Sequence, residues 1–417
     1  MNTKTLGKYS FGVGDRFAHQ AKAQLQAMIM ASEQGVAVTP VWNKSFREHS
    51  IIKSEPAETR TQADAAVKAL NWQGNYFVDA DHVNQDSVGF FMQSSDFFTL
   101  DVADYIGKPA EDSAIRAFIG ENRKYLGSLH IPGINEVFQV DESRLNEIAG
   151  KYLYAVKEAG KIYRKILEQK GSAAFIVEVS MDETDQPQTP LEIFFILSAL
   201  SGEKIPVDTL APKFSGRFNK GVDYVGDLAL FKKEFEQDLA VIQFAVSEFS
   251  FSPDLKLSVH SGSDKFSIYP IIRDAIRAGD TGLHIKTAGT TWLEEIIGLA
   301  MAGGGGLDLA KEVYRRSLER YDELCKPYAT VIDINKNRLP AVTEVRHWDG
   351  TKFADALRHD QTCERYNPDM RQLLHVGYKV AAEMKSEFYP ALEKYEATIA
   401  MQVTENIFSR HIKPLFL

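Results

Sequence analysis

Short apolar runs alternate with longer amphipathic segments along most of the chain. The first unit is a strand-like run at residues 9–17 that ends in a polar loop, followed by residues 19–34, whose apolar positions recur at helical spacing. This alternation predicts parallel strands with helices packed outside them. The predicted strands are residues 9–17, 36–42, 76–78, 97–101, 173–179, 205–211, 255–259 and 283–286. Eight such units favour a closed TIM-type (β/α)8 barrel over an open sheet.

The last quarter of the chain lacks this strand pattern. After Leu324 the alternation fades, and residues 373–409 have the periodicity of two or more helices. We therefore expect a catalytic α/β barrel domain at residues 1–324 and a helical C-terminal extension at residues 325–417, packed on the barrel. The glycines at 303–306 follow a predicted helix rather than a strand, which favours a flexible turn over a phosphate-binding loop.

The composition narrows the class of protein. A chain of 417 residues with 44% apolar content can bury one large core or two moderate ones. The net charge of −9 gives no general attraction to nucleic acid or to an anionic membrane, so an anionic substrate needs a locally cationic pocket. Two cysteines, Cys325 and Cys363, are too few for a disulfide framework, and the N-terminus lacks the layout of a signal peptide. We expect a cytoplasmic protein.

Chemistry-bearing side chains gather at the predicted C-terminal strand ends, which face one common pocket in a barrel of this kind. A single histidine is ordinarily a satisfied core residue, but three histidines with several carboxylates suit a divalent cation such as zinc, manganese, nickel or cobalt. No nicotinamide is expected, because Gly12-Val13-Gly14 lacks the third glycine of the dinucleotide-binding fingerprint. The strand-end candidates are Asp15, Arg16, Asp79, Asp81, His82, Glu178, Asp182, Lys213, His260, His284 and Lys286.

The segment Asp79-Ala80-Asp81-His82 is the densest of these groups. Alternation along a strand places Asp79 and Asp81 on one face and His82 on the other, so Asp81 and His82 share a site only if the chain turns after Asp81. Asp79 is equally well explained as the structural partner of a lysine on a neighbouring strand. Lys286 is either a buried charge paired with a carboxylate or a contact for the substrate.

Cationic residues form a second group at or just after strand ends. Several like charges in one pocket repel each other unless an anion neutralises them, which indicates a carboxylate or phosphate on the substrate. A solvated rim is the alternative, and we favour it for Lys220 and Lys265. Residues 287–291 offer helix-start N–H groups to an anion, although they also serve as ordinary caps. The group comprises Arg16, Lys213, Arg217, Lys220, Lys265 and Lys286, of which Arg16, Lys213 and Lys286 are the candidate substrate contacts.

Five ordered motifs lie at residues 77–82, 176–183, 210–214, 258–265 and 284–290. Together they resemble the tagaturonate epimerase family of bacterial hexuronate catabolism, over most of the chain. The resemblance implies a metal-dependent epimerase that interconverts D-tagaturonate and D-fructuronate. It also implies that Asp81 is the proton acceptor, that Glu178 is the proton donor or else a metal ligand, and that His82, His260 and His284 hold the metal.

The resemblance suggests a mechanism and leaves two alternatives open. The two sugar acids differ at a carbinol carbon that is not adjacent to the ketone, so direct enolisation does not acidify its hydrogen. Retro-aldol cleavage, in which a carboxylate removes the hydroxyl proton and a metal stabilises the enediolate, inverts this centre after rotation and re-addition. Another divalent-metal sugar isomerase or aldolase is the first alternative, and a non-catalytic sugar-acid-binding barrel is the second. The expected partner is a small sugar acid, with no nucleic acid or membrane, and the helical extension is compatible with a homo-oligomer.

Overall fold

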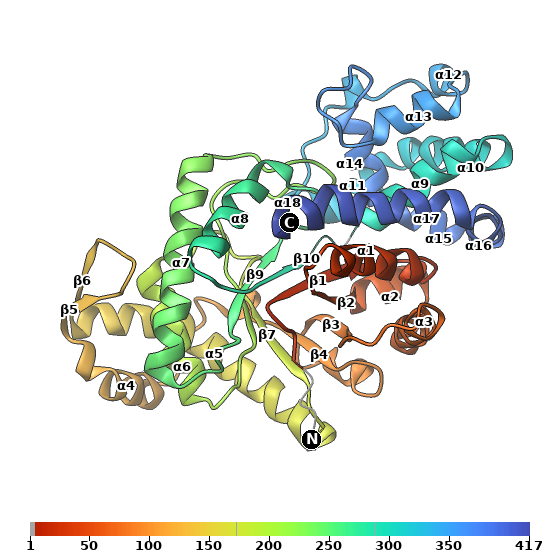
Figure 1. Cartoon of the computed structure of the whole chain (residues 1–417). Coiled ribbons are helices and arrows are strands. Elements are labelled where there is room, and N and C mark those ends of the chain that lie inside the picture. The colour runs from red at the N-terminus through yellow and green to blue at the C-terminus, as the bar shows by residue number, and fades with distance from the viewer. Residues whose placement is uncertain (1–4, 172, 288) are drawn as a thin grey trace.

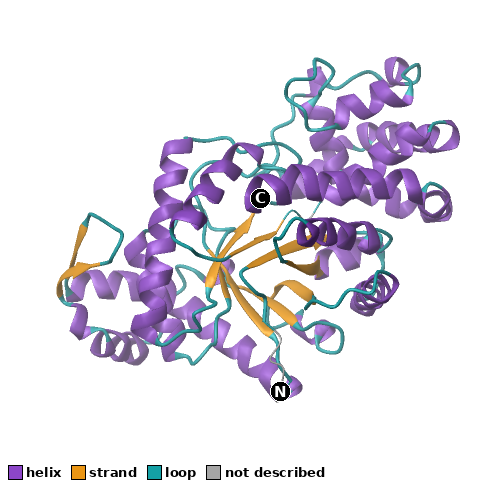
Figure 2. Ribbon diagram, viewed as in Figure 1, coloured by secondary structure: helices purple, strands orange, loops and turns teal. Residues whose placement is uncertain are grey.

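A closed barrel of eight parallel strands forms the centre of the protein (Figures 1 and 2). The structure, a computed structural model, describes residues 5–171, 173–287 and 289–417. The barrel strands are β1 (Tyr9–Gly14), β2 (Val38–Ser45), β3 (Phe77–Val83), β4 (Phe97–Asp101), β7 (Ile176–Ser180), β8 (Thr209–Ala211), β9 (Lys256–His260) and β10 (Leu283–Lys286). They follow the order β1-β10-β9-β8-β7-β4-β3-β2 around the barrel, and neighbouring strands are parallel. The predicted barrel is therefore confirmed, with the sixth strand shortened to its last three residues.

The inward-facing side chains of the barrel change from apolar to polar along the strands. An apolar layer crosses β3, β4 and β7. Asp79, Thr99 and Glu178 each lie two residues after that layer on these strands, and all three are buried. The apolar layer closes the barrel below the polar one, and the chemistry is left at the C-terminal ends of the strands, where barrel enzymes carry it. The apolar layer consists of Leu6, Val41, Phe77, Phe97 and Ile176.

Helices cover the outside of the barrel and bury the outward-facing strand residues in one large apolar cluster. They are α1 (Ala21–Glu33), α2 (Phe46–Ile52), α3 (Pro56–Ala69), α4 (Asp112–Glu121), α5 (Glu142–Lys170), α6 (Pro190–Gly202), α7 (Leu228–Phe249) and α8 (Tyr269–Ala278). The start of α6 illustrates how the sequence sets a boundary. Pro190 occupies its first turn, where its missing N–H is harmless, while Thr189 and Glu192 cap each other's backbone N–H groups.

The remainder of the chain is helical, as predicted. Its helices are α9 (Thr290–Ala302), α10 (Gly304–Glu319), α11 (Tyr321–Cys325), α12 (Val342–Val345), α13 (Gly350–Leu357), α14 (Pro368–Val376), α15 (Tyr378–Glu383), α16 (Lys385–Lys394), α17 (Glu396–Glu405) and α18 (Lys413–Phe416). A π-helical segment, Asn406–Ile412, joins the last two.

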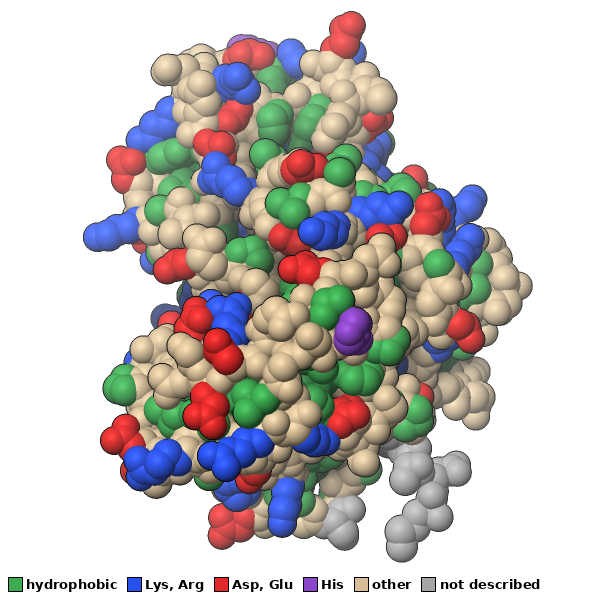
Figure 3. Space-filling model, turned by 90° about the vertical axis from the view of Figure 1, so that its left-hand side faces the viewer, with side chains coloured by type: hydrophobic (Ala, Val, Ile, Leu, Met, Phe, Trp, Pro, Cys, Tyr) green, Lys and Arg blue, Asp and Glu red, His purple; other side chains and the backbone are tan. Residues whose placement is uncertain are grey.

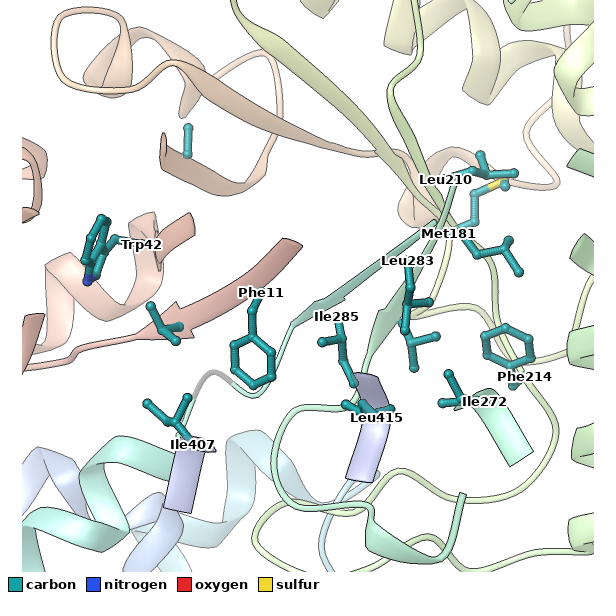
Figure 4. Packing of buried hydrophobic residues seen from close by; sticks show 14 of the residues in the cluster. Phe11, Trp42, Met181, Leu210, Phe214, Ile272, Leu283, Ile285, Ile407 and Leu415 are labelled. Atoms are coloured by element: carbon teal, nitrogen blue, oxygen red, sulfur yellow. The ribbon is translucent and has the colours of Figure 1, made fainter. Parts of the chain in front are cut away.

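The end of the chain packs against the outside of β1 and β10. Figure 4 shows Ile407 and Leu415 facing Phe11 and Ile285. This segment also contacts α1 on one side and α8 on the other, so it fills a place in the outer ring of helices. The extension therefore completes the barrel's outer layer, while the domain boundary after residue 324 stays a prediction.

One local expectation was wrong, and one element was missed. No pattern in the sequence predicted the antiparallel hairpin of β5 (Gly127–His130) and β6 (Val137–Val140), which stands apart from the barrel in Figure 1. Four-residue strands with mostly exposed side chains are too short to give a hydrophobic period. The expected glycine turn is limited to Gly303, because the following glycines start α10.

The surface agrees with a modest net charge. Figure 3 shows acidic and basic side chains interspersed over one face of the molecule. Within the described ranges, no helix has the length and apolar character needed to cross a bilayer.

Candidate active site

The C-terminal ends of the barrel strands open into a cavity of about 670 Å³ with a polarised lining. Carboxylates gather on the arc formed by β3, β4 and β7 and the loop after β7, whereas cations lie on the arc of the loops after β1, β2 and β8. The acidic arc holds Asp81, Asp101, Asp182, Glu183 and Asp185, and the basic arc holds Arg16, Arg47, Lys213 and Lys220, together with Glu48, which pairs with Arg16.

The end of β3 makes the turn that a shared site of Asp81 and His82 needs. His82 has a left-handed backbone (φ 51°), and the pairing of β3 with β4 shifts register between Ala80 and Val83. A bulge of this kind re-aims the side chains that follow it. Asp81 and His82 consequently both line the cavity, although they are adjacent in a strand.

His82, Asp182 and His260 form a candidate metal centre. Atoms able to bind a metal on these three side chains all lie within 4.8 Å of one another. His82 Nε2 is 3.5 Å from Asp182 Oδ1, and His260 Nδ1 is 3.1 Å from Asp182 Oδ2. Neither nitrogen makes a well-aligned hydrogen bond with a described residue, although both are buried. Two unsatisfied imidazole nitrogens converging on a carboxylate fit a divalent cation.

Two further carboxylates, Asp81 and Glu178, contact these imidazoles on the side away from Asp182. Asp81 Oδ1 lies 2.9 Å from His82 Nδ1, and Glu178 Oε1 lies 2.8 Å from His260 Nε2. Carboxylates in this position orient a metal-binding imidazole and increase its basicity. Although burial opposes it, Asp182 and Glu178 raise the pKa of His260 to about 9, so the site attracts positive charge. A cation bound here would replace these protons.

Lys286 joins the carboxylates at the centre of the barrel. Its Nζ lies 2.7 Å from Asp79 Oδ2, 2.8 Å from Asp81 Oδ1 and 2.9 Å from Glu178 Oε1. Despite burial, these three carboxylates hold the pKa of Lys286 well above its usual range, so it is an ammonium. Asp79 does pair with a lysine, but Lys286 lies on β10 across the barrel, so the expectation of a neighbouring strand's lysine was wrong in that respect. A contact between Lys286 and the substrate stays a prediction.

The remaining predicted site residues are distributed differently. His284 lies two residues before Lys286, with its Nδ1 2.9 Å from Ser10 Oγ, and burial lowers its pKa to about 3. It is not part of the His82, Asp182 and His260 group, so its role as a ligand stays a prediction. Glu178 is fully buried behind His260, whereas Arg16 and Lys213 line the cavity as expected.

Sequence reasoning missed two features of this site. It placed Asp182 among the strand-end candidates without choosing it as a ligand, although a position two residues past the end of β7 is a signal for one. It also gave no role to His375 and Tyr378, which line the cavity from α14 and α15. Helical periodicity marks such positions only as buried.

The fold and this cluster place the protein in the class of α/β-barrel enzymes with a candidate metal centre. Its sequence matches the profile of the tagaturonate epimerase family over residues 2–415. The chain belongs to this family and is therefore an epimerase.

Two relatives illustrate the match. The tagaturonate/fructuronate epimerase of Thermotoga maritima is 29% identical over 419 residues, which cover 97% of this chain and 80% of the relative. The native crystal structure of the fructuronate-tagaturonate epimerase from Cohnella laeviribosi is 24% identical and has a TM-score of 0.80 over 100% of this chain and 82% of that chain. Its one-glycerol complex has a TM-score of 0.79 over 99% of this chain and 82% of that chain. The structural likeness shows a shared fold.

Proposed function

We propose that this chain interconverts D-tagaturonate and D-fructuronate in the cavity, with a divalent cation held by His82, Asp182 and His260. The observation that carries the proposal is the pair of carboxylate-backed imidazoles whose free nitrogens face Asp182. Two nitrogens and one oxygen suit zinc, manganese, nickel or cobalt and leave positions for substrate oxygens. The name of the Thermotoga relative supplies the substrate pair.

The proposed reaction opens and closes one carbon–carbon bond. A carboxylate takes the proton from the hydroxyl of the carbon to be inverted, the bond toward the ketone breaks, and its electron pair enters the enediolate of the ketone fragment. The hydroxyl carbon becomes an aldehyde, which rotates and is attacked on its other face. Nothing is oxidised or reduced overall. A bound cation supplies the positive charge that stabilises the enediolate.

Asp81 is the proposed proton acceptor. It lines the cavity, and although burial opposes it, Lys286 and His82 keep its pKa below the usual range, so it is ionised. The resemblance suggests Glu178 as the proton donor, but, although burial opposes it, Lys286 and His260 keep its pKa well below the usual range, so its hydrogen bond to His260 supports an orienting role instead. The positions of Arg16 and Lys213 in the cavity lining support contacts with the substrate.

Turnover in deuterium oxide tests the retro-aldol route. We expect fructuronate formed from tagaturonate to carry no deuterium at the inverted carbon, because the hydrogen on that carbon stays attached while the carbon–carbon bond opens. Proton NMR of the product isolated early in the reaction makes the measurement, on enzyme supplied with each of the four metals. Deuterium at that carbon would instead indicate direct proton abstraction.

The cellular setting remains part of the proposal. Cys325 and Cys363 are free thiols, which supports a reducing, cytoplasmic compartment. A homo-oligomer stays a prediction.

A further inference from the structure

The C-terminal helical part of the chain forms one wall of the cavity. His375 comes from α14 and Tyr378 from α15, and Val331 from the preceding segment lies in the same lining. The backbone N–H of Lys220 donates to the carbonyl of Val331 at 2.8 Å, which ties this wall to the loop after β8. The wall therefore adjoins the basic arc.

His375 has an unsatisfied nitrogen in cationic surroundings. The residue is 2% exposed, and its Nε2 has no hydrogen-bond partner among the described residues. Burial first, and then the charges of Arg16, Lys220, Arg371 and Lys265, keep its pKa well below the usual range, so the imidazole is neutral. A buried polar nitrogen without a partner costs free energy. An anionic hydrogen-bond acceptor would satisfy the nitrogen and offset the surrounding positive charge.

Two glycines let these side chains approach the backbone closely. A Cβ at Gly289 would overlap the imidazole of His375 and would lie 3.3 Å from Arg16 Nη2, and a Cβ at Gly262 would lie 3.6 Å from Lys220 Nζ. Both glycines have positive φ, at 135° and 65°, which disfavours any side chain there. Gly262 is two residues past His260, so the ammonium of Lys220 lies beside the loop that carries this candidate ligand.

The two cations of this region differ in how they are held. Arg16 is fixed, because its Nε lies 3.1 Å from Glu48 Oε1 and its guanidinium lies 4.1 Å from the centre of the Tyr378 ring. Lys220 is half-buried, and within the described chain no carboxylate pairs with its ammonium. An unpaired ammonium at a cavity wall is available to a ligand, which departs from our expectation of a solvated rim for Lys220.

We infer that Lys220, Arg16 and His375 form a subsite for the substrate's carboxylate, and that this subsite holds the acid fragment while its aldehyde turns between bond breaking and bond formation. The inference rests on the proposed function. The polarised lining supports it, because an elongated anion avoids the acidic arc and directs its carboxylate to the basic one.

The chemistry explains why such an anchor is needed. Cleavage divides the sugar acid into a ketone-derived enediolate and a three-carbon aldehyde that bears the carboxylate. Only the aldehyde must rotate, and no covalent bond holds it while it does so. A carboxylate bound at one end leaves the carbonyl carbon free to present its other face, and it keeps the fragment from leaving.

Lys220→Met, in metal-loaded enzyme, tests the subsite. We expect its Kd for tagaturonate, measured by calorimetry, to rise about 10- to 100-fold, since a charged hydrogen bond to the carboxylate is lost. The Kd for D-tagatose, a ketose without the carboxylate, should change less than about twofold, as for any group that recognises only the carboxylate. Turnover with an aldehyde-trapping hydrazine should yield more trapped three-carbon acid per epimerisation than the wild type gives.

Lys220→Arg should restore most of the affinity, and Lys232→Met, on the exposed face of α7, should match the wild type. His375→Ala should weaken tagaturonate binding while sparing D-tagatose. A tagaturonate Kd unchanged in Lys220→Met, or equal losses for both sugars, would overturn the subsite. The two proposals can fail separately. If the wild type binds tagaturonate more tightly than Lys220→Met does but does not epimerise it, the proposed function is refuted and the subsite stands.

Discussion

Replacing His260 with alanine is expected to remove the bound cation and to lower kcat/KM for tagaturonate by about a thousandfold or more. The variant loses one of the three proposed metal ligands. It also removes the imidazole whose Nε2 lies 2.8 Å from Glu178 Oε1. Charge stabilisation by a metal is worth several kcal/mol, and about 1.4 kcal/mol corresponds to a tenfold change in rate. Plasma mass spectrometry of protein purified without chelator, together with initial rates of fructuronate formation, makes the measurement.

Three further variants sharpen this test. Asp182→Asn should lose metal as His260→Ala does, whereas His347→Ala, at an exposed histidine in the turn after α12, should retain metal and rate. His284→Asn decides the remaining assignment, because retained metal would exclude His284 as a ligand. A His260→Ala enzyme that keeps a full equivalent of metal and normal activity would refute the proposed site.

The barrel could be predicted because its signal is local. Each strand–helix unit has its own hydrophobic period, and parallel strands bring their C-terminal ends together whatever the sequence distance between them. Strand alternation made a turn after Asp81 the condition for a shared site, and the structure provides that turn through a bulge and the positive φ of His82. The placement of Asp81, His82 and His260 at the mouth of the barrel follows from their positions at strand ends.

The rest of the site depends on tertiary packing. His375 approaches Arg16 only because the C-terminal helices fold back over the barrel mouth, and nothing near residue 375 in the sequence indicates that contact. The central position of Lys286 among three carboxylates is also a matter of geometry, since the sequence left a buried ion pair and a substrate contact equally open. Strand periodicity gives the direction of a side chain, but not the partners that it meets inside a closed barrel.

Replacing Lys286 with methionine is expected to destabilise the fold by about 3–5 kcal/mol at neutral pH. The ammonium is 4% exposed and compensates Asp79, Asp81 and Glu178, which are themselves buried. Removing one partner of a buried ion pair leaves an uncompensated charge in a medium of low polarity. This raises the free energy of the native state relative to the unfolded state. Chemical denaturation of the variant and of Lys232→Met, the same change at an exposed lysine, gives the comparison.

The loss of unfolding free energy caused by Lys286→Met should increase with pH. Burial raises the pKa of Asp79 to about 6 even though Lys286 opposes it, and loss of the ammonium raises it further. A carboxyl whose folded pKa exceeds the unfolded value of about 3.9 binds protons more tightly in the native state, so the unfolding free energy falls as pH rises through that range. The deficit of the variant relative to wild type should therefore grow as the pH rises through about 6, the pKa of Asp79 in the wild type, and beyond it. A deficit that is constant with pH would mean that lost packing, and not uncompensated charge, sets the cost.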